Sequence, residues 1–141
     1  MMLLDTSGLL SALFPDQQGH ESSAEALRRS DPPLILSPFV LAEIDYLIEK
    51  MSGVDVELQF LEEVSRGAYQ VAPFDRRDIE AARFIIAKYR DLGIGLADAS
   101  IMVLADRYQT RQLLTLDERH FRVLKMESGD AFRILPADLD V

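Results

Sequence analysis

Four acidic side chains, far apart in the sequence, have the chemistry to form one hydrolytic metal site. They are Asp5, Glu43, Asp98 and Asp117. Carboxylates that converge without a matching Lys or Arg repel one another. A hard divalent cation such as Mg²⁺ relieves that repulsion, because it prefers oxygen ligands and retains several waters. Such an ion lowers the pKa of a bound water, and a second ion can hold the leaving oxygen of an in-line displacement at phosphorus. The acids would then be metal ligands and water-positioning groups rather than covalent nucleophiles.

The elements that must position these acids alternate between short apolar runs and longer amphipathic stretches. The apolar runs predict strands at 2–4, 34–36, 69–71, 112–115 and 132–134. Helices are predicted at 7–14, 21–29, 38–52, 54–65, 75–89 and 96–108. Strands that alternate with helices pair in parallel through right-handed crossovers. The sequence therefore predicts one α/β domain over residues 1–141, a three-layer α/β/α sandwich around a central parallel five-stranded sheet. The last residues, with Asp138 and Asp140, are expected to form a loose tail.

This topology brings the four acids to one edge of the sheet. In open parallel sheets, sites form outside the carboxyl ends of the strands. Asp5 ends the first predicted strand, and Asp117 lies just past the fourth. Glu43 lies in the first turns of the helix after the second strand, and Asp98 lies near the start of the helix that follows Gly95. A site assembled from four separate parts of the chain is therefore expected at this edge.

Each acid also has an ordinary structural interpretation. Asp5 can cap the helix that follows it, and Asp98 and Asp117 can be first-turn acids favoured by the helix dipole. Glu43 can lie on the solvent face of its helix. Asp45, two residues later, is a competitor, but it projects to a different side of that helix. The joint pattern of four acids at one edge favours the cation site over four separate structural roles.

Three short hydroxyl side chains, Thr6, Ser7 and Thr115, lie beside the acids. They can hydrogen-bond the carboxylates or a substrate phosphate, or they can serve in helix capping and turns. For Ser7 the capping role is the favoured interpretation. Thr115 is the better candidate for supporting the site, because it precedes Asp117 by one strand period.

Basic residues are concentrated around the fourth predicted strand. They are Arg107, Arg111, Arg119, Arg122 and Lys125. Arg119 and Arg122 flank Asp117 and are candidate contacts to an RNA backbone, because local charge can matter more than net charge. An ordinary solvated surface is an equally good interpretation. Arg107 and Arg111 are expected on the far side, near the end of their helix.

The net charge of −9 by itself argues against nucleic-acid binding, since phosphate affinity comes mainly from Lys and Arg. Divalent ions bound by the acids would invert the local charge. Part of the negative charge is therefore interpreted as a cation site.

The remaining residue types exclude or disfavour other chemistries. The chain has no cysteine, which excludes disulfides and thiolate metal sites and fits a reducing cytoplasm. His20 is predicted to be solvated, and His120 to be structural, with no assigned role. No nucleophile–base pair and no Gly-rich phosphate loop support acyl transfer or nucleotide-cofactor binding. The apolar start of the chain, at 1–14, is too short and wrongly flanked for a membrane span or a signal peptide, so a cytoplasmic location is expected.

With these residues in view, the chain resembles the PIN-domain ribonucleases, and specifically the VapC toxins of bacterial toxin–antitoxin pairs. The matching segments are Leu3-Leu4-Asp5-Thr6-Ser7, Ala42-Glu43, Gly95-Leu96-Ala97-Asp98-Ala99 and Leu114-Thr115-Leu116-Asp117. The resemblance covers essentially the whole chain. No single motif is specific, but the four acids in this order and at these separations are a strong joint signal.

The resemblance implies a PIN-like parallel sheet flanked by helices and an endoribonuclease that holds Mg²⁺ or Mn²⁺ with its four acids. It implies RNA hydrolysis that leaves a 5′-phosphate, a homodimer, and neutralisation by a cognate VapB-type antitoxin. In the family, the antitoxin tail commonly wraps the toxin and directs a basic side chain at the acids. Segments 37–47 and 115–121 look similar to a subgroup that cuts large-subunit ribosomal RNA at the sarcin–ricin loop.

Other functions are compatible with parts of this pattern. A tRNA-cleaving toxin and a housekeeping RNA-processing nuclease would use the same site. A catalytically silent PIN-fold binding module would be favoured by the loss of an acid, and all four are present. A phosphatase with Asp5 as nucleophile usually needs a second Asp two residues later, where this chain has Ser7. The leading hypothesis is therefore a metal-dependent endoribonuclease toxin.

Overall fold

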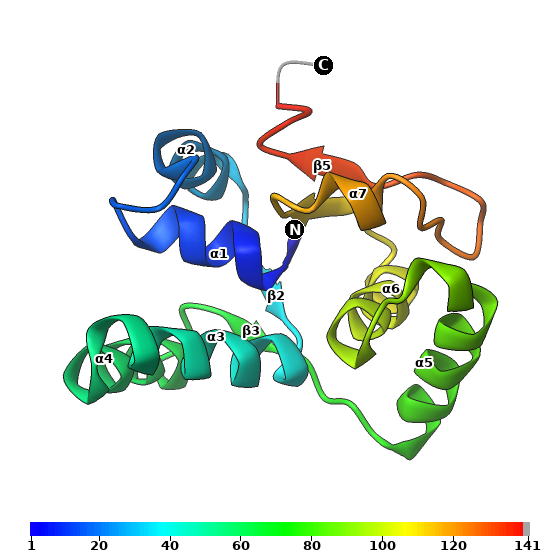
Figure 1. The fold of residues 1–141 in the computed structure, drawn as a ribbon, viewed down its shortest axis with the longest axis horizontal. Coiled ribbons are helices and arrows are strands. Elements are labelled where there is room, and N and C mark those ends of the chain that lie inside the picture. The colour runs from blue at the N-terminus through cyan, green and yellow to red at the C-terminus, as the bar shows by residue number, and fades with distance from the viewer. Residues whose placement is uncertain (140–141) are drawn as a thin grey trace.

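The computed structural model describes residues 1–139 and has a parallel five-stranded sheet at its centre, flanked by helices (Figure 1). The strands are β1 (Met2–Leu4), β2 (Leu34–Leu36), β3 (Gln70–Val71), β4 (Gln112–Leu114) and β5 (Arg133–Leu135). Their order is β3-β2-β1-β4-β5, and every neighbouring pair is parallel. The predicted fold class is confirmed. The third strand begins one residue later than predicted, and the fifth is shifted by one residue.

Seven α-helices and one 3₁₀ helix are present in residues 1–139. They are α1 (Thr6–Leu13), α2 (His20–Arg29), α3 (Pro38–Ser52), α4 (Val54–Ser65), α5 (Arg76–Lys88), the 3₁₀ helix η1 (Arg90–Leu92), α6 (Leu96–Tyr108) and α7 (Glu118–Phe121). The longer helices pack in pairs around the sheet, α1 with α2, α3 with α4 and α5 with α6 (Figure 1). The sequence patterns predicted neither η1 nor α7, because one helical turn is too short to show a periodic apolar face.

Helix α3 illustrates how local sequence sets these elements. The Ser37 hydroxyl accepts a hydrogen bond from the Phe39 backbone N–H at 3.2 Å, and Pro38 occupies the first turn, where its missing N–H costs nothing. The helix ends at Ser52, before Gly53, whose φ of 86° is favourable only for glycine. The side chains that α3 buries recur at every fourth residue, at Val40, Ile44 and Ile48.

The register of the two central strands fixes the edge where the acids meet. Leu4 of β1 is paired with Leu114 of β4. Asp5 and Thr115 therefore leave the sheet side by side, and the Asp5 N–H donates to the Leu114 carbonyl at 3.0 Å. Strand β1 is buried along its whole length, as expected for a central strand covered on both faces.

The segment near the carboxyl end is more ordered than predicted. Asp138 pairs with Arg122 at 2.7 Å and accepts a hydrogen bond from the Ile134 backbone N–H at 2.8 Å. The expectation of a loose tail is therefore wrong for Asp138, because these contacts tie it to α7 and β5. Asp140 lies outside the described residues.

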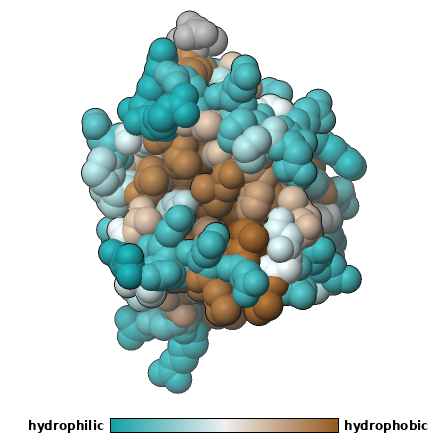
Figure 2. Space-filling view, turned by 90° about the vertical axis from the view of Figure 1, so that its left-hand side faces the viewer, coloured by the Kyte–Doolittle hydropathy of each residue, from teal (hydrophilic) through white to brown (hydrophobic). Residues whose placement is uncertain are grey.

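The surface carries apolar side chains on the side formed by the first four helices. Figure 2 shows a continuous apolar area on this face, bordered by hydrophilic residues. Tyr46, Met51, Val54 and Leu58, all on α3 and α4, have exposed side chains. None of the helices within residues 1–139 is long and apolar enough to cross a membrane.

Candidate active site

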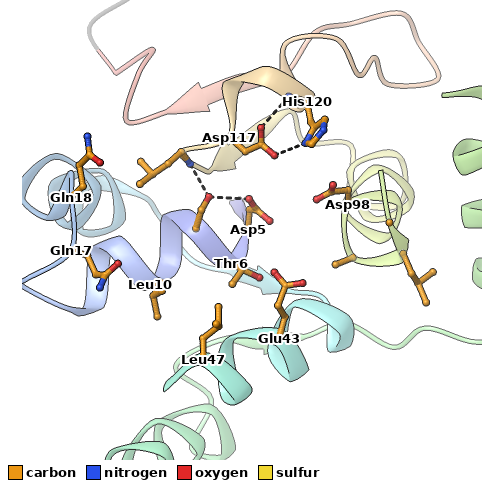
Figure 3. Close-up of a pocket in the computed structure, with 15 residues that line it drawn as sticks. Asp5, Thr6, Leu10, Gln17, Gln18, Glu43, Leu47, Asp98, Asp117 and His120 are labelled. Atoms are coloured by element: carbon orange, nitrogen blue, oxygen red, sulfur yellow. Dashed lines mark hydrogen bonds and ion pairs between the residues drawn. The ribbon is translucent and has the colours of Figure 1, made fainter. Parts of the chain in front are cut away.

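A cavity of about 660 Å³ opens at the carboxyl edge of the sheet, and all four predicted acids line it (Figure 3). Asp5 lies at its base, at the end of β1, with Glu43 on α3, Asp98 on α6 and Asp117 at the start of α7 around it. Farther from the acids the lining is apolar and amide-bearing, with Leu10, Leu47, Gln17 and Gln18. No Lys or Arg in residues 1–139 lines the cavity.

Asp5 is the most deeply buried of the four acids, with 7% of its surface exposed. Its Oδ2 accepts hydrogen bonds from the Thr115 hydroxyl at 2.6 Å and from the Ser7 hydroxyl at 3.1 Å. Burial raises the pKa of Asp5, and these two hydrogen bonds oppose the rise because they stabilise the charged form. Asp5 precedes α1 at the N-cap position but makes no side-chain capping bond, so its carboxylate is directed to the site instead.

The hydroxyls of Ser7 and Thr115 connect Asp5 to the segment that carries Asp117. Thr115 Oγ1 accepts from the Asp117 backbone N–H at 3.0 Å, and Ser7 Oγ accepts from the Leu116 backbone N–H at 3.0 Å. The two hydroxyls are 3.1 Å apart. The predicted contact of Thr115 with a carboxylate is present. Ser7 also binds the carboxylate, so the capping role favoured for it is wrong.

The pKa of Asp98 is raised well above its ordinary value. Burial raises its pKa from the ordinary 3.8 to about 6, and the negative charges of Asp5, Asp117 and Glu43 contribute to the same shift. His120 acts in the opposite direction. Burial and like charges both disfavour the ionised form, so the carboxyl of Asp98 holds its proton to a higher pH than an exposed aspartate does.

The raised pKa of Asp98 predicts a measurable dependence of metal-free stability on pH. The folded state binds the proton more tightly than the unfolded state, so this contribution is fully present below pH 3.8 and is lost as pH rises through about 6. Asn mimics the protonated form. Metal-free Asp98→Asn should therefore be more stable than the wild type at pH 7.5, by on the order of 2 kcal/mol. Urea unfolding of both proteins between pH 5 and 7.5 checks this. The stability difference should shrink toward pH 5, and a difference that stays constant with pH would contradict the assignment.

Asp117 is bound on both of its oxygens by one residue, His120. The His120 backbone N–H donates to Asp117 Oδ1 at 3.0 Å, and the ring Nδ1 lies 2.7 Å from Oδ2 (Figure 3). Asp117 is the N-cap of α7 rather than the first-turn acid that the structural interpretation had offered, and the same carboxylate also faces the cavity. His120 was predicted to have no role, yet it lines the cavity. The spacing Asp-x-x-His is the signal that could have found it, because the third residue after an N-cap faces the cap.

Glu43 and Asp45 project to different sides of α3, as predicted. Glu43 lines the cavity. Asp45 does not, and it faces α4 instead, where its hydrogen bond and negative charge raise the pKa of Glu57.

The predicted basic contacts lie outside the cavity. Arg122 is paired with Glu118 at 2.8 Å and with Asp138 at 2.7 Å, so its charge is balanced by two carboxylates. This disfavours the prediction that Arg122 contacts RNA. Arg119 is exposed on α7 beside the site. Arg107 pairs with Asp78 at 2.8 Å, away from the cavity, as expected.

The residues of the cavity suit a divalent cation. Donor atoms of Asp98, Asp117 and His120 all lie within 4.8 Å of one another. The Thr6 hydroxyl, which also lines the cavity, is buried without a hydrogen-bond partner among the described residues. Four carboxylates in a cavity that no described Lys or Arg lines form a donor set for a hard, oxygen-preferring ion.

A parallel sheet in this order with four acids at its carboxyl edge defines a class of protein. The chain belongs to the PIN domain family, whose sequence model matches residues 2–125. A relative, Ribonuclease VapC26 of Mycobacterium tuberculosis (strain ATCC 25618 / H37Rv), is 44% identical over 135 residues, which cover 96% of this chain and 100% of the relative. The family resemblance inferred from the sequence is therefore confirmed.

Solved structures of more distant proteins share the fold. The structure of VapC20 from Mycobacterium tuberculosis, described as a sarcin–ricin loop cleaving toxin, matches with a TM-score of 0.76 and 14% identity over 83% of this chain and 90% of that one. A toxin–antitoxin complex from Klebsiella pneumoniae matches with a TM-score of 0.69 and 19% identity, covering 88% of this chain and 92% of that one. At these identities the likeness concerns the fold alone.

Proposed function

We propose that this protein is a metal-dependent endoribonuclease of the VapC type and the toxin of a toxin–antitoxin pair. The observation that carries the proposal is the convergence of four acids in one cavity that no described Lys or Arg lines. The 44% identity to a protein named as a ribonuclease, along its full length, supports RNA as the substrate. The alternatives of a housekeeping nuclease and a silent binding module have no observation in their favour.

Under this proposal the four acids share one task, and the hydroxyl and apolar residues of the cavity have others. Asp5, Glu43, Asp98 and Asp117 would hold Mg²⁺ or Mn²⁺, which when bound acidifies water and stabilises negative charge on the scissile phosphate. The hydrogen bonds from Thr115 and Ser7 favour the ionised form of the Asp5 carboxylate against the effect of its burial, and they fix its rotation. The unpartnered Thr6 hydroxyl is a donor for a phosphate oxygen. Leu10 and Leu47 form an apolar wall of the cavity that a bound RNA would contact on one side.

Chelation gives the direct test of metal dependence. Purified protein treated with EDTA and then dialysed should lose RNA cleavage, because the four carboxylates cannot by themselves activate water or neutralise the phosphate. Addition of Mn²⁺ or Mg²⁺ should restore it, with cleavage products carrying 5′-phosphates. Cleavage of a labelled RNA is measured on denaturing gels. Full activity in EDTA would refute the proposed metal-dependent mechanism.

We further propose the sarcin–ricin loop of large-subunit ribosomal RNA as the substrate, on the strength of segments 37–47 and 115–121. Mapping 5′-phosphate ends across total RNA after brief induction tests this, with an Asp98→Asn variant as the control for host nucleases. A single induced site in that loop would support the proposal. Induced ends confined to transfer RNA would refute it and leave the ribonuclease activity standing.

A cognate VapB-type antitoxin and a second copy of the chain are the proposed partners, in the cytoplasm. Exposed apolar areas bordered by polar residues mark interaction sites on soluble proteins. The apolar face of Figure 2, with exposed Tyr46 and Leu58 on the nearby helices α3 and α4, is the surface we assign to partner binding. Co-purification with the protein encoded by the neighbouring gene, and light scattering of the free protein, test the two partners separately.

A further inference from the structure

His120 makes two contacts that the four acids alone do not account for. Its backbone N–H and its ring Nδ1 bind the two different oxygens of Asp117 at 3.0 and 2.7 Å (Figure 3). An ionised carboxylate can only accept hydrogen bonds, so Nδ1 carries a proton in this contact. One residue therefore holds the carboxylate at both ends and fixes its rotation.

The local fold explains why the two donors converge. Asp117 is the N-cap of α7, and His120 is the third residue of that helix. The N–H at this position points back at the capping side chain. The same turn directs the imidazole ring over the carboxylate, where a Glu or Gln of an ordinary capping box would reach for the backbone instead. The short helix α7 thereby places a ring donor beside an acid of the cavity.

Asp117 needs such a restraint because it faces other negative charges. A carboxylate oxygen of Asp117, one of Asp98 and a ring nitrogen of His120 lie within 4.8 Å of one another. Without the ring N–H, the carboxylate would keep only the backbone contact and could rotate away from Asp98. A rotated carboxylate would no longer present a free lone pair to an ion between them.

We propose that His120 is the positioning residue for Asp117, and that its Nδ1–H sets the carboxylate rotation in which Asp117 can share a divalent cation with Asp98. This inference rests on the proposed function, since it concerns the same site. Groups that hydrogen-bond a ligating carboxylate typically contribute about 10–100-fold to metal affinity. The role is distinct from that of a ligand, because His120 acts through Asp117.

The test uses Mn²⁺ binding to the metal-free protein, measured by calorimetry or by the EPR signal of free Mn²⁺ in the absence of RNA. His120→Ala should weaken Mn²⁺ binding by about 10–100-fold. His120→Asn should stay within about threefold of the wild type, because its amide NH₂ can occupy the place of Nδ1–H. His20→Ala is the matched control. The His20 ring binds the Ser11 carbonyl at 2.9 Å outside the cavity, and this variant should bind Mn²⁺ like the wild type.

A double-mutant cycle separates positioning from ligation. In an Asp117→Ala background, His120→Ala should cause no further loss of Mn²⁺ affinity, because its effect passes through Asp117. Additive losses, or equal losses in His120→Asn and His120→Ala, would overturn the proposal. Unchanged Mn²⁺ affinity in His120→Ala would also overturn it. Thermal unfolding of each metal-free variant shows whether that variant is folded. A wild type that binds Mn²⁺ but cleaves no RNA would refute the proposed function and not this inference.

Discussion

Asp98→Asn should reduce RNA cleavage by about a thousandfold while the protein remains folded. The substitution keeps the shape of the side chain and removes its negative charge. Burial and the neighbouring acids raise the pKa of this carboxyl to about 6. A metal ion in such a site supplies several kcal/mol of transition-state stabilisation, and each 1.36 kcal/mol is a factor of ten in rate. Single-turnover cleavage of a labelled RNA measures the loss. Circular dichroism and thermal unfolding of the same preparation measure the fold.

Asp5→Asn should cause a loss of similar size, for a related reason. Asn can still accept the hydrogen bond from Thr115, so the connection between β1 and the Asp117 segment survives while the charge is lost. Helix α3 provides a matched pair of controls, because Glu43 lines the cavity and Asp45 does not. Glu43→Gln should impair cleavage, and Asp45→Asn should leave it unchanged. Retained cleavage by both Asp98→Asn and Asp5→Asn would refute the assignment of the four acids.

The four acids could be predicted because residues that follow parallel strands in the sequence lie at the same edge of the sheet. Asp5 and Asp117 follow strands that the structure pairs through Leu4 and Leu114, so both leave the same edge of the sheet. Glu43 and Asp98 were placed at this edge because each lies near the start of a helix, and the family resemblance supported both. Such arguments need only the order of the elements and the direction of their strands.

The contacts that orient the acids could not be predicted in the same way. The role of His120 depends on a one-turn helix, α7, which has no apolar periodicity to reveal it. The hydrogen bond between Ser7 and Asp5 depends on the rotation of side chains, and hydroxyls beside a helix start are more often capping groups. Arg122 was a candidate RNA contact because it lies in a basic stretch beside Asp117, and its pairing with Asp138 was missed because that segment was expected to be loose. Sequence position predicted which residues meet, and the structure was needed to show which atoms bind.

Gly8→Ala should destabilise the fold, because at Gly8 helix α1 packs directly against the backbone of β4. A Cβ added to Gly8 would lie 2.4 Å from the Leu114 carbonyl oxygen and 2.7 Å from the Thr115 nitrogen. Gly→Ala within a helix ordinarily gains about 1 kcal/mol. Here the clash is with backbone, which cannot rotate away. We expect a net loss of about 2–3 kcal/mol in unfolding free energy, at the upper end for overpacked sites.

Gly95→Ala is the control for this prediction, since nothing lies within 4 Å of a Cβ at that position and its φ of −102° suits alanine. Its unfolding free energy in urea should change by less than about 1 kcal/mol. The two variants together test whether close approach, rather than the loss of glycine, is the cause. Gly8→Ala should also weaken cleavage at temperatures where it is folded, because α1 carries Ser7 and Thr115 directly follows β4, and the hydroxyls of these two residues hold Asp5. Wild-type stability in Gly8→Ala would mean that α1 and β4 separate easily, and that the position of Asp5 does not depend on their contact.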